Sequence, residues 1–198
     1  MLSVVSRRSL SILAAVCCVV VLTRAGLAAP VAWTGAGDGV LWQDPANWSS
    51  DPALPGPDDD VTISSAVVSA VTHGAGTTTI RSLQCEADLS VTGGSLKVAA
   101  DSEVSGSMSV SAGIHVIVDG AGSEWVFSGA VSVAGAWLES TNGGGYSAAL
   151  LTSLSETRLI LRGAGATASF PNLSNIDAAR LQMYDGATFV LPAGVTSY

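Results

Sequence analysis

Internal repetition constrains the fold of this 198-residue chain more than any other feature. Three segments are related by an offset of 22 residues, namely 151–154 (LTSL), 173–176 (LSNI) and 195–198 (VTSY). Leu159 returns as Leu181 at the same spacing, and residues 105–110 (SGSMSV) match 128–133 (SGAVSV) at an offset of 23. A unit this short cannot bury its apolar side chains alone, so the repeats must stack on one another.

The residues between the repeats have the periodicity of strands. Downstream of Ile63, short runs that alternate apolar and polar residues are separated by Gly, Ser, Ala and Asp, as at 96–98 and 114–118. Alternation at period two is typical of a strand, and no window from 60 to 198 has the spacing of a helix with caps. The sequence therefore predicts an all-β fold.

Repetition and periodicity together predict a right-handed parallel β-helix, a solenoid, over residues 64–198. Its turns have roughly 19–23 residues and stack Leu151, Leu173 and Val195 in one column. A β-sandwich is the alternative, because Asp-Gly pairs such as Asp119-Gly120 fit hairpin turns. Since residue 198 falls within the third copy of the 22-residue element, we also expect the solenoid to be truncated at its C-terminus.

A Trp-rich segment, residues 33–63, precedes the repeats and shares none of their periodicity. An open solenoid end exposes unpaired strand edges and apolar side chains. We therefore predict that residues 29–63 form an N-terminal aromatic cap and the first strand. The predicted cap residues are Trp33, Gly37, Asp38, Gly39, Trp42, Asn47, Trp48, Pro55, Gly56, Asp59 and Asp60.

The spacing of Trp, Gly, Asn and Asp in this segment resembles the N-terminal start of secreted bacterial right-handed β-helix proteins. These are surface or exported proteins related in architecture to autotransporter passengers and pectin-lyase-like folds. The resemblance covers about 31 residues, and residues 170–177 and 185–192 also resemble repeats of long exported proteins of environmental bacteria. It implies an exported location and an elongated shape, since most such proteins have no established activity.

Residues 1–28 have the three parts of a signal peptide. Arg7 and Arg8 precede the apolar run 10–22, and small residues follow, with cleavage predicted after Ala28. The paired arginines also fit a twin-arginine export signal as an alternative. We predict a secreted or cell-surface protein with no membrane span once the signal is removed.

Removal of the signal leaves an acidic chain. Arg7, Arg8 and Arg24 leave with it, so five basic residues stand against 16 acidic ones and the net charge becomes −11. Such a chain repels phosphate backbones, which argues against nucleic acid as a partner. Cys85 is then the one remaining cysteine, which we predict to be a small buried side chain, with a disulfide to another chain as the alternative.

Few residues suggest chemistry. The run Asp58-Asp59-Asp60 could bind Ca²⁺, but its carboxylates also suit backbone N–H groups in turns. His115 alternates with apolar neighbours and should face outward, and His73 should lie in a Gly-rich turn. Neither histidine has a nucleophile or carboxylate at motif spacing, so we predict no catalytic, cofactor-binding or metal-binding residues.

Arg158 and Arg180 are 22 residues apart and should stack on the outer face of adjacent turns. Two cations this close repel each other, and Glu156 and Asp177 are near enough in sequence to neutralise them. The alternative is a small anion-binding ladder for a carboxylated or phosphorylated glycan.

The sequence as a whole predicts a non-catalytic, exported structural or adhesion module with no cofactor. Its expected partner is an extracellular glycan or another surface protein. A polysaccharide lyase or a glycan-binding β-helix protein is the alternative.

Overall fold

The computed structural model describes residues 29–197; the predicted signal peptide, residues 1–28, and Tyr198 lie outside the described residues. Eighteen short strands and one 3-10 helix, η1 (Pro45–Asn47), make up the described chain. The strands are two to five residues long because Gly, Ser and Asp turns interrupt them. The all-β prediction is confirmed.

The strands form three sheets that run the length of the molecule. The eight-stranded sheet contains, in spatial order, β1 (Ala29–Ala32), β2 (Asp59–Ile63), β5 (Ser82–Cys85), β8 (Ser102–Val104), β11 (Glu124–Phe127), β14 (Gly145–Ala148), β16 (Thr167–Ser169) and β18 (Thr188–Phe189). The six-stranded sheet contains β4 (Thr77–Ile80), β7 (Ser95–Val98), β10 (His115–Asp119), β13 (Trp137–Thr141), β15 (Arg158–Arg162) and β17 (Arg180–Tyr184). The four-stranded sheet contains β3 (Ala70–His73), β6 (Asp88–Val91), β9 (Met108–Val110) and β12 (Val131–Ser132).

Each strand pairs in parallel with the strand one turn further along the chain, which makes a solenoid of about six turns. Leu159 lies beside Leu181, as the 22-residue offset predicts, and Met108 lies beside Val131, as the 23-residue offset predicts. Two early pairings are slightly closer in sequence than predicted, since Val71 pairs with Leu89 and Ile80 with Val98 at an offset of 18.

The predicted column at the C-terminal repeats is also present. Ser153, Asn175 and Ser197 pair in parallel at 22-residue steps, a register that places Leu151, Leu173 and Val195 over one another. Leu151 and Leu173 are buried, and Val195 packs against the core. All pairings between the named strands are parallel, so the sandwich alternative is wrong.

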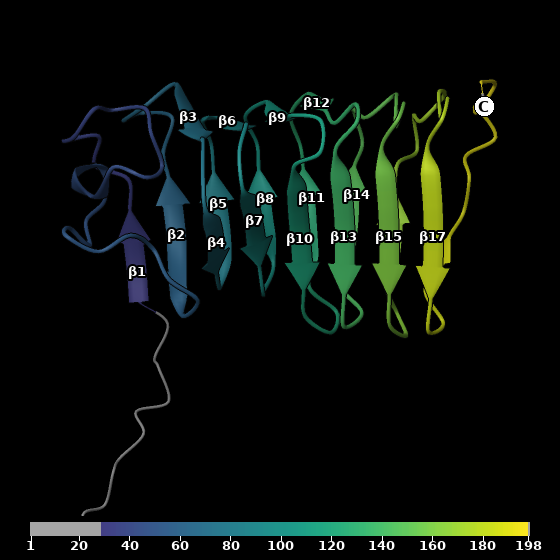
Figure 1. The fold of residues 1–198 in the computed structure, drawn as a ribbon, viewed down its shortest axis with the longest axis horizontal. Coiled ribbons are helices and arrows are strands. Elements are labelled where there is room, and N and C mark those ends of the chain that lie inside the picture. The colour runs from purple at the N-terminus through teal and green to yellow at the C-terminus, as the bar shows by residue number, and fades with distance from the viewer. Residues whose placement is uncertain (1–28, 198) are drawn as a thin grey trace, which may run out of the picture.

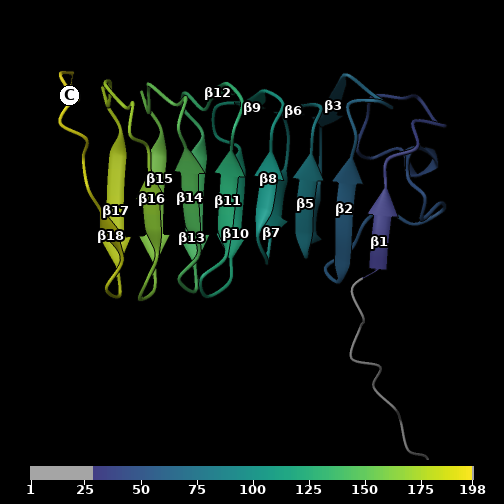
Figure 2. The same cartoon turned by 180° about the vertical axis from the view of Figure 1, so that it is seen from behind.

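The three sheets face three directions around one apolar core. The six-stranded sheet is on the near side in Figure 1, the eight-stranded sheet is on the near side in Figure 2, and β3, β6, β9 and β12 lie along the top edge. Close stacking of the turns requires small residues at corners, since a Cβ at Gly129 would overlap the carbonyl of Gly106 in the preceding turn. Within residues 29–197, no helix has the length and apolarity needed to cross a membrane.

Candidate functional site

The three tryptophans of the Trp-rich segment form one buried cluster. The ring of Trp48 lies between those of Trp33 and Trp42, with centroid distances of 4.8 and 4.7 Å and edge-on geometry. All three side chains are at most 3% exposed, and Trp48 Nε1 donates to the carbonyl of Trp42 at 2.8 Å. Edge-on aromatic contacts of this kind stabilise beyond the apolar area that they bury.

Asn47 organises the loop that carries these rings. Its Oδ1 accepts the N–H groups of Gly37 (3.0 Å) and Gly39 (2.9 Å), while its Nδ2 donates to Asp38 Oδ1 (2.8 Å) and the Leu41 carbonyl (3.0 Å). The side chain is fully buried. One amide therefore satisfies four groups of an irregular loop, which explains why the segment needs Asn at this position.

Two carboxylates complete the loop. Asp38 Oδ1 accepts the N–H groups of Leu41 (2.8 Å) and Val40 (2.9 Å), and these bonds, together with that from Asn47, lower the Asp38 pKa below its ordinary value. Asp44, which sequence reasoning missed, accepts the Asp38 N–H at 2.8 Å and caps η1. The Asp44-Pro45 pair at the start of a short helix was the available signal.

The loop bonds to the edge of the four-stranded sheet. Trp42 N–H donates to the Thr72 carbonyl and Thr72 N–H donates to the Val40 carbonyl, both at 2.9 Å. The Trp42 ring also contacts the ring of His73, 5.8 Å between centroids. On the neighbouring sheet, β1 pairs along β2.

The placement of His73 corrects the expectation of a turn. It ends strand β3, points inward and is fully buried, because the Gly-rich turn begins only at Gly74. Nδ1 lies 3.0 Å from the Gly93 carbonyl and therefore donates to it, so Nε2, 2.8 Å from Thr78 Oγ1, accepts the hydroxyl proton in the neutral ring. Burial lowers the His73 pKa below its ordinary value.

The predicted cap residues around the start of β2 already have partners within the chain. Pro55 is buried, Asp59 Oδ2 accepts the Gly56 N–H at 2.7 Å, and Asp60 binds Arg81 and Ser82. Among residues 29–197, no group of three or more His, Cys, Asp or Glu side chains is arranged to hold a metal ion. Asp59 therefore fits the prediction that these carboxylates accept backbone N–H groups in tight turns. Asp60 instead binds side chains of the next solenoid turn.

Arg158 and Arg180 do stack, as predicted, at equivalent positions of β15 and β17. The expected neutralisation by Glu156 and Asp177 is wrong. Arg158 instead places its guanidinium carbon 4.7 Å from the centroid of the Trp137 ring, and its Nε donates to Gln182 at 2.8 Å. Glu156 lies in a turn at positive φ and Asp177 accepts from Ser197.

An aromatic residue extends the same column. His115, half-buried on the outer face as predicted, packs its ring against Trp137 at 4.1 Å between centroids. The order along the sheet is therefore His115, Trp137, Arg158 and Arg180, in successive strands. Cys85 is buried as predicted, and burial raises the pKa of its thiol to about 11.

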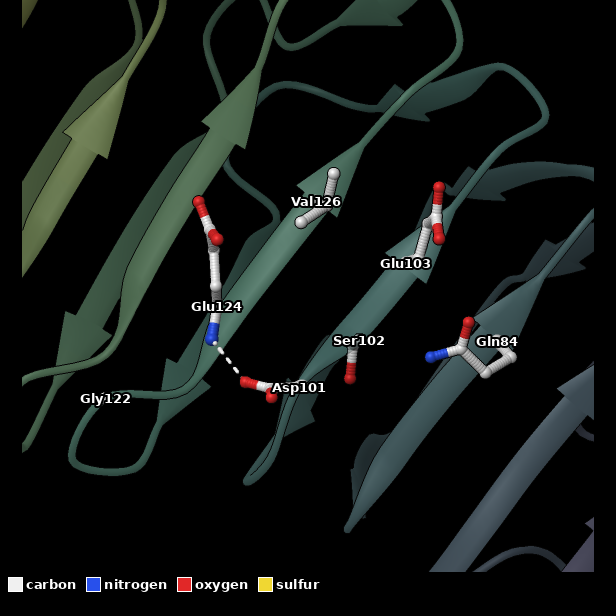
Figure 3. Close-up of a pocket in the computed structure, with 7 residues that line it drawn as sticks. All are labelled: Gln84, Asp101, Ser102, Glu103, Gly122, Glu124 and Val126. Carbon is white, nitrogen blue, oxygen red and sulfur yellow. Dashed lines mark hydrogen bonds between the residues drawn. The ribbon is translucent and has the colours of Figure 1, made fainter.

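A pocket of about 340 Å³ opens on the outer face of the eight-stranded sheet. Gln84 on β5, Asp101 and Glu103 at β8, and Glu124 and Val126 on β11 line it (Figure 3). Asp101 Oδ1 accepts the Glu124 N–H at 3.0 Å, and the side chain of Val126 lies between those of Glu103 and Glu124 in Figure 3. The carboxylates thus line the pocket without converging on one point.

Sequence reasoning missed this pocket. Asp101 and Glu124 are 23 residues apart, which is the offset that relates residues 105–110 to 128–133, so the repeat itself was the available signal. Carboxylates, a carboxamide and one apolar side chain can bind a hydroxyl-rich ligand.

The basic residues lie elsewhere. Of those in the described chain, Lys97, Arg158, Arg162 and Arg180 are on the six-stranded sheet, and Arg81 lies between β4 and β5 and pairs with Asp60 on β2. The pocket on the eight-stranded sheet therefore has no basic side chain in its lining.

No protein-family model, curated protein or solved structure matches this chain.

Proposed function

We propose that this chain is an exported, non-catalytic structural or adhesion module built on a right-handed β-helix. The observation that carries this proposal is the use of charged side chains to join one turn to the next. Arg81 pairs with Asp60, Lys97 with Asp119, and Arg162 with Glu139 at 3.2 Å, in each case across 21 to 23 residues of sequence.

Hydroxyl side chains also bond from one turn to the next. Glu86 accepts from Ser64 at 3.0 Å, and Ser90 and Ser109 are hydrogen-bonded at 2.9 Å. An active site instead gathers an acid, a base and a binding group around one reacting atom. Because these polar side chains bond to neighbouring turns, they favour a role for the chain in shape and rigidity.

In this proposal the Trp-rich segment is the cap of the first turn. Support comes from the three buried rings and from the hydrogen bonds that Thr72 makes with Trp42 and with Val40. Strand edges left open at the end of a sheet are sites of unwanted pairing, so a segment that occupies them suits an exported solenoid.

Glycan binding is a second candidate, favoured by the pocket on the eight-stranded sheet. Asp101, Glu103 and Glu124 supply hydrogen-bond acceptors in a pocket whose lining has no basic side chain, which suits the hydroxyl groups of a neutral glycan better than a uronate. Retention of the purified chain on a neutral polysaccharide, weakened by Glu124→Gln and not by Glu156→Gln in a remote turn, would favour this candidate.

The test of the leading proposal is a search for turnover. The purified chain is incubated with pectate and alginate in the presence of Ca²⁺, and with neutral β-glucans, while unsaturated products and new reducing ends are measured. We expect neither. Turnover that is lost in Arg158→Ala, Arg180→Ala or Glu124→Gln would overturn the non-catalytic proposal.

A further inference from the structure

Two hollows on the outer face of the eight-stranded sheet adjoin and form one groove. The pocket of about 340 Å³ shares Gly122 and Glu124 with a second hollow of about 210 Å³. The other residues that line the second hollow are Ser123, Gly143, Gly145, Gly165 and Thr167. The groove therefore reaches from β5 to β16, within the sheet and away from both of its ends.

The groove runs along the axis of the solenoid, because its residues occupy equivalent positions of successive turns. Glu124 pairs with Gly145, and Gly145 pairs with Thr167. Asp101 lies beside Glu124 in the preceding turn, since Ser102 pairs with Trp125. Four positions at the strand spacing of a sheet extend over roughly 14 Å. Gly145 has no side chain to fill the groove, so an extended ligand can lie across these turns.

The groove differs from the rest of the solenoid in how its carboxylates are neutralised. Three other carboxylates on strands form ion pairs with a cation from an adjacent turn, as Glu139 does with Arg162. Within residues 29–197 the carboxylate of Glu124 has no such partner, and its neighbour in the preceding turn is the acidic Asp101 (Figure 3). Like charges at facing positions destabilise a sheet, so a cation bound in the groove would stabilise this one.

We propose that the groove binds a linear amino glycan, an oligosaccharide whose sugar units have free, positively charged amino groups. Asp101 and Glu124 accept hydrogen bonds from the ammonium groups. The Gln84 carboxamide and the Thr167 hydroxyl can donate as well as accept, which suits the sugar hydroxyl groups. The side chain of Val126 offers an apolar contact to the C–H groups of a sugar ring. This inference rests on the second candidate function, glycan binding, and adds a positive charge to the ligand.

A basic peptide is the other linear polycation that such a groove could attract. Extended peptides bind to sheets mainly through main-chain hydrogen bonds along a free strand edge. The groove lies on the face of the sheet, where β8, β11 and β14 are each paired on both sides. Side-chain carboxylates, a carboxamide and a hydroxyl are the groups on offer, and these match an amino sugar better than a peptide backbone.

Calorimetric titration of the purified chain tests the proposal with two β-1,4-linked tetrasaccharides, one of glucosamine and one of N-acetylglucosamine. The acetyl group removes the charge and leaves the sugar ring unchanged. At about pH 6, where amino groups are protonated, we expect the glucosamine tetramer to bind at least tenfold more tightly, by an interaction that weakens in high salt. Glu124→Gln should weaken this binding about fivefold. Glu156→Gln removes the same charge from an exposed turn and should leave it unchanged.

The outcomes separate this inference from the candidate function on which it rests. Equal affinity for the two tetramers, or a Glu124→Gln chain that binds the glucosamine tetramer normally, would overturn the inference and leave glycan binding in place. A chain that binds neither tetramer would contradict both. Tetralysine that binds as tightly as the glucosamine tetramer would show that charge alone is recognised, and the assignment to an amino glycan would be wrong.

Discussion

The two ends of the described solenoid contain equivalent apolar columns, but their side chains differ in exposure. Val61, Val71 and Ile80 in the first turn are at most 1% exposed, whereas Met183 and Leu191 in the last described turn are 42% and 44% exposed. The first turn is in contact with the Trp-rich segment and with β1. Repeats shield only their neighbours, and an end must be shielded by residues that do not repeat.

The strongest test of this comparison removes a ring from the N-terminal end. Trp48→Ala should destabilise the chain by about 3–5 kcal/mol, because it leaves a cavity between two other rings. Met183→Ala, in the last described turn, should have an effect below about 1.5 kcal/mol, since the side chain is already partly in water. Urea unfolding measures both. Equal losses would show that the two ends do not differ in packing.

The next test concerns the loop that holds the rings. Asn47→Ala removes four hydrogen bonds around a buried site and should destabilise by about 2–3 kcal/mol. Asn172→Ala is the matched change toward the other end, where an exposed amide donates once, to the Ala149 carbonyl. Its effect should stay below about 1 kcal/mol. A harmless Asn47→Ala would mean that the loop is held by its rings alone.

Acid should weaken the N-terminal end first. The His73 pKa is lowered by burial from 6.5, so below that pH the unfolded chain binds a proton that the folded chain excludes. Stability is therefore present above pH 6.5 and is lost as the pH falls, by up to about 1.4 kcal/mol per pH unit. Carboxylates with lowered pKa, such as Asp60, add a separate loss at lower pH.

Unfolding measured between pH 7.5 and 5 checks this slope. His73→Gln should flatten it, whatever its effect on stability at pH 7.5, while His115→Gln on the outer face should leave it in place. If the free energy of unfolding of His73→Gln still fell with pH in the same way, another group would be responsible for the acid sensitivity.

The smallest expected effect lies in the bonds between turns. Glu139→Gln removes the ion pair with Arg162 on the outer face and should destabilise by less than about 1 kcal/mol. The loss should shrink further in high salt. A loss as large as that for Trp48→Ala would mean that surface pairs, and not buried columns, hold the turns together.

The repeat made the solenoid predictable in detail, including the pairs Leu159 with Leu181 and Met108 with Val131. The sequence offset predicts which residues pair because equivalent positions of successive turns stack on one another. The segments that do not repeat were harder to predict from the sequence. His73 looked like a turn residue because Gly74 follows it, and only the three-dimensional structure shows its ring under Trp42.

Side-chain partners on the outer faces were the hardest to predict. Proximity in sequence suggested that Glu156 neutralises Arg158. Glu156 lies in the turn before β15, however, and Arg158 is the first residue of the strand, so their side chains do not pair. The actual contacts of Arg158 are Trp137 and Gln182, one turn before and one turn after. The pocket beside Glu124 escaped for the same reason, since its members belong to different turns.

The nearly constant distance in sequence between paired strands also bears on how the chain folds. After the pairing of β1 with β2, each new strand closes a loop of 18 to 23 residues, so no step carries a much larger entropic penalty than another. The contact between residues 40–42 and Thr72 closes a loop of about 30 residues, somewhat longer than one turn. Because each turn contacts only its neighbours, folding of such a chain can start at any turn and propagate along the stack.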